Sequence, residues 1–141
     1  MKQKQKQETL HPVNTNPGVH PIGVIDVDRY RCITQDIATD EVIITDERIE
    51  HIKEHHPGHW ESIGPFLQAA LIDPDYILKY DAKTGLILKT IEENDLQFQL
   101  VLRLHTSDDP AGFKNSVLSA WQIRKKEYNR LIRNKIILYK R

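Results

Sequence analysis

The 141-residue sequence is poor in the features that mark secreted and membrane proteins. It has one cysteine, Cys32, so no disulfide can form within the chain. No run of about 18 apolar residues occurs, which argues against a membrane-spanning helix. The basic, glutamine-rich start of the chain has no apolar stretch behind it and does not resemble a signal peptide. We therefore expect a cytoplasmic protein that does not associate with membranes.

The motifs of several enzyme classes are also absent. The sequence contains no glycine-rich phosphate loop, no dinucleotide-binding fingerprint, no serine-centred nucleophile elbow and no paired-cysteine motif. His51 and His55 share one helix face, but the residues between them do not form the His-Glu-x-x-His pattern of zinc proteases. We expect chemistry without a cofactor. A zinc site that adds His59 to this pair is the weaker alternative.

The net charge is zero, but the charges are unevenly distributed. Residues 26–109 contain 18 acidic and 8 basic side chains, whereas residues 111–141 contain 9 basic side chains and only Glu127 as an acidic one. Phosphate contacts need a local basic patch rather than a positive net charge. The C-terminal segment therefore favours nucleic-acid binding, and the alternative is a charged surface that contacts only water.

The chain length suits one domain, which we expect to cover residues 23–141. Residues 1–22 are expected to form a flexible arm, because lysine and glutamine alternate there and two His-Pro pairs disfavour helix. The roughly alternating residues from Gly23 to Thr34 predict a strand, and 42–44 are a short apolar run.

Two helices are predicted after residue 44. Thr45 is a good N-cap, and the first helix is expected to end at His56-Pro57-Gly58. Apolar residues at helical spacing predict a second helix from about Trp60 that stops at Asp73-Pro74. The period then changes to two, which predicts strands over 76–80, 86–91, 96–105 and 116–123.

A basic helix is expected from Arg124, fraying into the apolar run 136–139. That run suits a last strand, the packed end of a helix or a dimer contact. Helices followed by an antiparallel meander indicate an α+β fold. We expect N-terminal helices packed on an antiparallel sheet of four to five strands, with a basic C-terminal helix.

Four residues are the leading candidates for chemistry. His51 lies within the first helix, and its ordinary pKa suits general acid–base catalysis. Lys89 and Arg103 lie on adjacent predicted strands, so we expect them to converge on one face and stabilise the charge of a pentavalent phosphate. Ser119 is placed to donate a hydrogen bond to a phosphate oxygen. The alternative is that each is an ordinary polar residue on a half-exposed sheet.

These residues occur in an order that resembles a known family. The segments that carry the resemblance are Thr45–Ile52, His56-Pro57, Ile72–Ile77, Lys89 in a strand and Ser119-Ala120-Trp121. Over about residues 42–122 they resemble the phage-associated branch of the barnase–EndoU–colicin–RelE nucleases. The resemblance leaves out the N-terminal arm and the basic C-terminal segment.

The resemblance implies a toxin-like, metal-independent endoribonuclease in which the 2′-hydroxyl of RNA attacks the phosphate and leaves a 2′,3′-cyclic phosphate. It implies that His51 is the general acid or base, that Arg48, Lys89 and Arg103 bind the phosphate, and that Ser119 replaces the usual threonine. The second proton-transfer group stays open between Glu50, His55, His56 and His105. Further candidates for substrate binding are Lys114, Arg124 and Lys125.

RNA is the expected partner. A protein that neutralises the enzyme is also expected, because a ribonuclease made in the cytosol endangers its host. The alternative function is a non-catalytic module that binds RNA or protein through the basic C-terminal segment and the arm.

Overall fold

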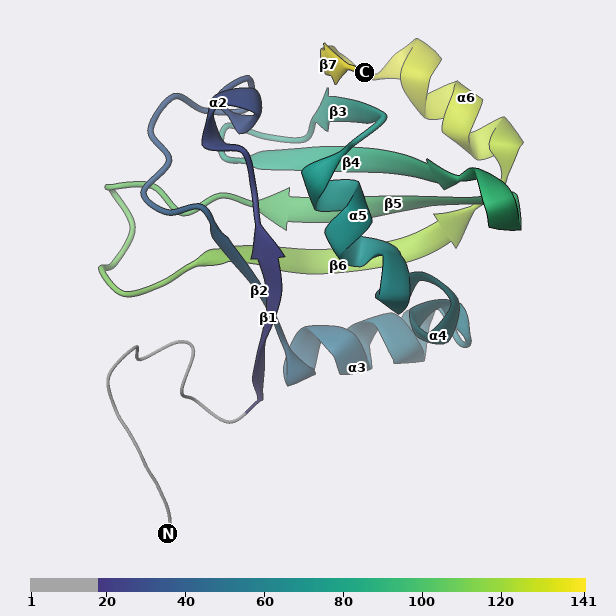
Figure 1. Ribbon diagram of the computed structural model, residues 1–141, viewed down its shortest axis with the longest axis horizontal. Coiled ribbons are helices and arrows are strands. Elements are labelled where there is room, and N and C mark those ends of the chain that lie inside the picture. The colour runs from purple at the N-terminus through teal and green to yellow at the C-terminus, as the bar shows by residue number, and fades with distance from the viewer. Residues whose placement is uncertain (1–17) are drawn as a thin grey trace, which may run out of the picture.

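The structure is a computed structural model and describes residues 18–141. All strands of this part of the chain join one seven-stranded sheet in the order β1-β2-β6-β5-β4-β3-β7 (Figure 1). Neighbouring strands are antiparallel, except that β2 and β6 are parallel. The described residues contain no helix that is long and apolar enough to cross a membrane. The elements are β1 (Val19–Val24), α2 (Val27–Tyr30), β2 (Glu41–Thr45), α3 (Asp46–His55), α4 (His59–Ile63), η1 (Gly64–Phe66), α5 (Leu67–Ile72), β3 (Tyr76–Lys79), β4 (Thr84–Ile91), η2 (Glu92–Asn94), β5 (Leu96–Arg103), β6 (Asn115–Ile123), α6 (Lys125–Asn134) and β7 (Ile137–Lys140).

The predicted α+β class is confirmed, but the predicted sheet of four to five antiparallel strands is wrong. The sheet has seven strands, and the parallel pairing of β2 with β6 makes it mixed. The apolar run 136–139 falls largely in β7, an edge strand antiparallel to β3. These pairings join segments that are distant in the sequence, so local patterns do not reveal them.

The N-terminal boundary also differs from the expected one. Strand β1 begins at Val19, so the last residues of the expected arm 1–22 belong to the sheet. The expected strand from Gly23 to Thr34 ends at Val24, and the side chain of Asp26 then caps the short helix α2. Residues 1–17 of the expected arm lie outside the described residues.

Helix α3 begins and ends where its sequence predicts. The Thr45 hydroxyl accepts a hydrogen bond from the Arg48 N–H at 3.3 Å, which satisfies one of the free donors at the helix start. The helix ends at His55, just before Pro57 and Gly58, and Gly58 has a positive φ of 84°. The predicted second helix is instead split into α4, η1 and α5, because Pro65 has no N–H to continue an α-helix.

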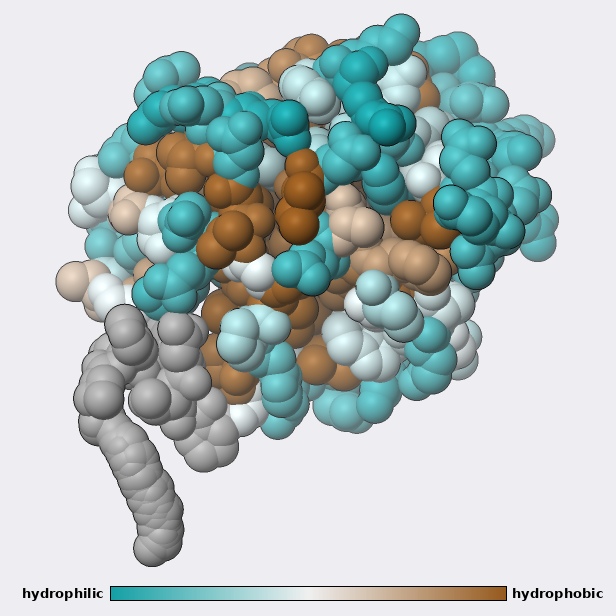
Figure 2. Space-filling view, viewed as in Figure 1, coloured by the Kyte–Doolittle hydropathy of each residue, from teal (hydrophilic) through white to brown (hydrophobic). Residues whose placement is uncertain are grey.

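The sheet separates two apolar clusters. In β5, Phe98, Leu100 and Leu102 are fully buried on the side of α3, α4 and α5, whereas Val101 packs with Leu131 of α6 on the other side. The alternation predicted for this strand is therefore confirmed. Figure 1 shows α5 lying across the first face. In the same view, hydrophobic residues gather around β1 and hydrophilic residues surround them (Figure 2).

A β-bulge in β6 determines which of its side chains lie on each face of the sheet. The register shifts between Val101–Ser119 and Leu102–Val117, so Leu118 is the extra residue. Val117 consequently lies in the cluster beneath α3–α5, while Leu118 packs with the cluster of α6. The period of two expected over 116–123 is therefore interrupted at Leu118, and Val117 and Ser119 lie on opposite faces of the sheet.

Candidate active site

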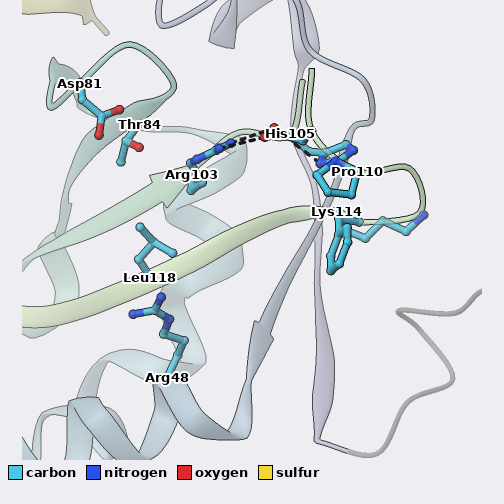
Figure 3. Close-up of a pocket in the computed structure, with 10 residues that line it drawn as sticks. Arg48, Asp81, Thr84, Arg103, His105, Pro110, Lys114 and Leu118 are labelled. Atoms are coloured by element: carbon cyan, nitrogen blue, oxygen red, sulfur yellow. Dashed lines mark hydrogen bonds and ion pairs between the residues drawn. The ribbon is translucent and has the colours of Figure 1, made fainter. Parts of the chain in front are cut away.

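A groove lies on the face of the sheet that packs against α6. Two cavities of about 550 and 500 Å³ form it, and Arg48 and Leu118 line both. Figure 3 shows the smaller cavity, where Leu118 lies between Arg48 and Arg103. The larger cavity is lined from α3, the sheet and α6, chiefly by Arg48, His51, His55, His56, Gln99, Ser119, Trp121, Glu127, Arg130, Leu131 and Lys135.

Helix α3 forms one wall of the groove. Arg48, His51 and His55 are spaced three and four residues apart, which places them on one face of the helix. Ile52 is fully buried in the core and fixes the rotation of the helix. The ring centroids of His51 and His55 are 4.1 Å apart, and His55 Nδ1 donates to the His51 carbonyl at 3.0 Å. The His51 ring is exposed and has no hydrogen bond within residues 18–141.

Two further histidines, His56 and His59, contact residues of β6. The His56 ring stacks on Trp121 with centroids 4.7 Å apart and an interplanar angle of 6°. His59 Nδ1 accepts the Gln122 backbone N–H at 2.9 Å, which leaves the ring proton of a neutral His59 on Nε2. Burial lowers the pKa of His56, and the neighbouring His59, His55 and His51 lower it further.

Acidification below pH 6.5 is expected to destabilise the fold partly through His56. Its folded pKa lies below the ordinary histidine value of 6.5, so the unfolded chain binds this proton more readily than the folded protein. The free energy of unfolding therefore falls as the pH drops from 6.5 through the folded pKa. Urea unfolding at several pH values below 6.5 should show a smaller decrease in the free energy of unfolding for His56→Gln than for wild type. Equal losses in both proteins would contradict the assignment.

The cations of the groove differ in how far their charge is already neutralised. Arg103 donates to both carboxylate oxygens of Asp109 at 3.0 Å, and this pairing holds the pKa of Asp109 well below its usual range. Lys114 donates to Glu41 at 2.9 Å. Arg48 and Lys135 have no side-chain hydrogen bond or ion pair within residues 18–141. Arg48 and Lys135 are therefore the cations best placed to meet an incoming phosphate.

Lys89 lies away from the groove. The register pairs Lys89 with Phe98 and Arg103 with Thr84, so the two cations lie on opposite faces of the sheet. The expectation that they converge is wrong. Only 9% of the Lys89 side chain is exposed, and its Nζ donates to the Asp73 carbonyl at 2.7 Å. The carboxylates of Asp73 and Asp75 lie 3.5 and 3.6 Å from the same atom.

The start of the basic segment also lies outside the groove. Arg124 precedes α6 and is exposed. Lys125 forms an ion pair with Asp95 at 3.1 Å near the β4–β5 turn. The segment contributes other residues to the groove, which the sequence analysis did not select: Arg130, Leu131 and Lys135. Arg130 and Leu131 lie three and four residues after Glu127, which also lines the groove, and that spacing was a helical signal that they share a face.

The arrangement thus brings together five of the eight selected residues, and it leaves out Lys89, Arg124 and Lys125. Ser119 is half-buried on the floor of the larger cavity, across from Val101. The roles assigned to all eight stay predictions. Among residues 18–141, no three His, Cys, Asp or Glu side chains are grouped so as to hold a metal ion, so the arrangement does not support the alternative zinc site.

One comparison with known proteins found a match. A family of phage-associated nucleases matches residues 19–140. None of the curated proteins and none of the solved structures matches the chain. The match is longer than the predicted resemblance over 42–122, and it includes the basic C-terminal segment that the prediction left out. The chain belongs to the family described as phage-Barnase-EndoU-ColicinE5/D-RelE like nuclease2.

Proposed function

We propose that the protein is an endoribonuclease whose active site is the groove. Membership of a nuclease family supports cleavage of a phosphodiester. The observation that carries the proposal is the wall of α3, where the exposed His51 stands one turn from Arg48, which has no ion pair within residues 18–141. Both line the cavity that has Ser119 on its floor. A proton-transfer group, a cation and a hydroxyl donor thus line one cavity.

These groups suit transfer of a phosphoryl group within RNA. A base removes the proton of the 2′-hydroxyl, and its oxygen forms a bond to the adjacent phosphorus. The bond from phosphorus to the 5′-oxygen breaks, and an acid protonates that leaving oxygen. The products are a 2′,3′-cyclic phosphate and a free 5′-hydroxyl. Arg48 and Ser119 stabilise the extra negative charge of the pentavalent phosphate, and His51 carries one of the two protons.

The geometry narrows the choice of the second proton-transfer group. Glu50 does not line the groove, and His105 lines only the smaller cavity. His55 and His56 line the larger cavity together with His51. His55 is the better candidate, because its Nδ1 proton is bound to a carbonyl and its neutral form leaves Nε2 as an acceptor.

The proposal is tested with two RNAs of one sequence, one natural and one carrying 2′-O-methyl groups throughout. With EDTA present, the protein should cleave the natural RNA to products with cyclic phosphate ends and leave the methylated RNA intact. Cleavage of both RNAs would exclude attack by the 2′-hydroxyl. A gel shift of the natural RNA without cleavage would instead identify a non-catalytic binding module.

Arg48→Gln is expected to weaken RNA binding and its dependence on salt. Each phosphate contact to a single strand contributes about 0.7 to the slope of log affinity against log salt, so the slope should become shallower by about that amount. Fluorescence anisotropy with the methylated RNA measures binding without cleavage. The matched control is Lys53→Gln, because Lys53 is on the same helix but does not line the groove. Equal slopes for all three proteins would remove Arg48 from the phosphate site.

A cytosolic enzyme of this kind would cleave the RNA of its own host. The proposal therefore includes a neutralising protein, for which blocking the groove between α3 and α6 is the simplest mode of action. Such a protein should protect natural RNA from cleavage at an equimolar ratio.

A further inference from the structure

A buried amide on the floor of the groove has no hydrogen-bond partner in the described part of the chain. Gln99 lies in the middle of β5 with only 5% of its surface exposed, and its side chain lines the larger cavity. Within residues 18–141 this side chain has no hydrogen bond. A carboxamide has both donors and an acceptor, and leaving them unmatched in a buried position is costly. Buried polar groups without partners are rare and are often kept for a function.

Aromatic side chains lie near Gln99. Trp121 is its direct neighbour across β5 and β6, and the His56 ring stacks on Trp121. Tyr80, which is 59% exposed, lines the same cavity. Proteins recognise the bases of single-stranded RNA by stacking them on aromatic rings and by hydrogen bonding to their edges. Gln99 and its neighbours supply both kinds of contact.

We propose that this part of the groove is a base-binding subsite in which Gln99 hydrogen-bonds the edge of one nucleobase, so that it selects the nucleotide beside the cleaved bond. The inference rests on the proposed ribonuclease function. The nucleobases differ in the order of donors and acceptors along their edges, so a carboxamide held in one orientation forms two hydrogen bonds with only some of them. His51 and Ser119 line the same cavity, so a base held there keeps its phosphate close to them.

A second glutamine of the same strand provides a matched control. Gln97 lies two residues before Gln99 and therefore on the same face of β5, and it is nearly as buried, with 6% of its surface exposed. Its side chain donates to Asp95 at 3.4 Å and lines a different cavity near the β4–β5 turn. Gln97→Leu thus also replaces a buried carboxamide of β5 by an apolar side chain, but it leaves the residues around Gln99 unchanged.

The test measures the affinities of adenosine, guanosine, cytidine and uridine 3′-monophosphates for wild type, Gln99→Leu and Gln97→Leu by calorimetry. Wild type and Gln97→Leu should prefer one nucleotide by about tenfold or more. The preference should disappear in Gln99→Leu while the shared affinity for the phosphate remains. Far-ultraviolet circular dichroism checks that both variants are folded.

Binding of mononucleotides does not depend on catalysis, so the two proposals fail separately. A preference that Gln99→Leu removes supports the subsite, even if the protein cleaves no RNA. Equal affinities for the four nucleotides in wild type, or a preference that Gln99→Leu retains, would overturn the subsite. If the protein nevertheless cleaved RNA, the ribonuclease proposal would not be affected.

Discussion

Replacing His51 by alanine is expected to lower the rate of RNA cleavage by about 10²–10⁴-fold, the usual contribution of one general acid or base. His51 is exposed and its ring has no hydrogen bond within residues 18–141, so the variant should unfold at the same urea concentration as wild type. The measurement is the single-turnover rate on a natural RNA. A loss of activity together with a loss of fold would not support a catalytic role.

Another exposed histidine serves as the control for this variant. His20 lies on β1, where its Nε2 is 2.6 Å from an oxygen of Asp46, and it does not line the groove. His20→Ala should therefore cleave RNA at the wild-type rate. If both variants lose activity equally, the effect does not arise from proton transfer in the groove.

Replacing Lys89 by methionine is expected to lower the free energy of unfolding by about 2–3 kcal/mol. Removal of one partner from a buried ion pair costs about 3–5 kcal/mol, and the value here is smaller because Asp73 is half-exposed. The change leaves the mostly buried carboxylate of Asp75 without this cation. Urea unfolding measures the free energy of unfolding of each protein. The control Lys79→Met, at an exposed position of β3, should change this free energy by less than about 0.5 kcal/mol.

The cleavage rate of the same variant tests whether Lys89 has a catalytic role. Since Lys89 lies on the face opposite Arg103 and the groove, the folded fraction of Lys89→Met should cleave RNA at the wild-type rate. A folded and stable variant that does not cleave RNA would show that Lys89 takes part in the activity.

The parts of the fold that were predicted correctly depend on local chemistry. Thr45 caps α3 through a hydrogen bond three residues away, and the turn after His55 ends it. The alternation of β5 was also visible, because one of its faces is uniformly apolar. Each of these signals lies within a window of about ten residues, so the sequence alone is sufficient to place the element.

The parts that were missed depend on pairings between distant segments. Nothing near Lys89 shows that its strand turns this residue toward Asp73 and away from Arg103. The bulge at Leu118 depends on how β6 meets β5. The strands β1, β2 and β7 at the two ends of the sheet are only six, five and four residues long, which leaves little room for a pattern of period two.

The candidate site shows the same division. Helical spacing placed His51 and His55 on one face, and the structure brings them together at one cavity. Sequence could not reveal that Asp109 already neutralises Arg103, or that the buried Gln99 side chain has no hydrogen bond among residues 18–141. Both facts depend on which side chains meet in three dimensions, and both affect how the groove would bind RNA.

The central claim is that the groove cleaves RNA through His51 by attack of the 2′-hydroxyl. The most direct test incubates end-labelled RNA in EDTA with wild type and with His51→Ala, and then analyses the product ends. Wild type should give 2′,3′-cyclic phosphates, and the folded variant should leave the RNA intact over the same time. Intact RNA with both proteins, or the same cyclic products at the same rate from both, would contradict the claim.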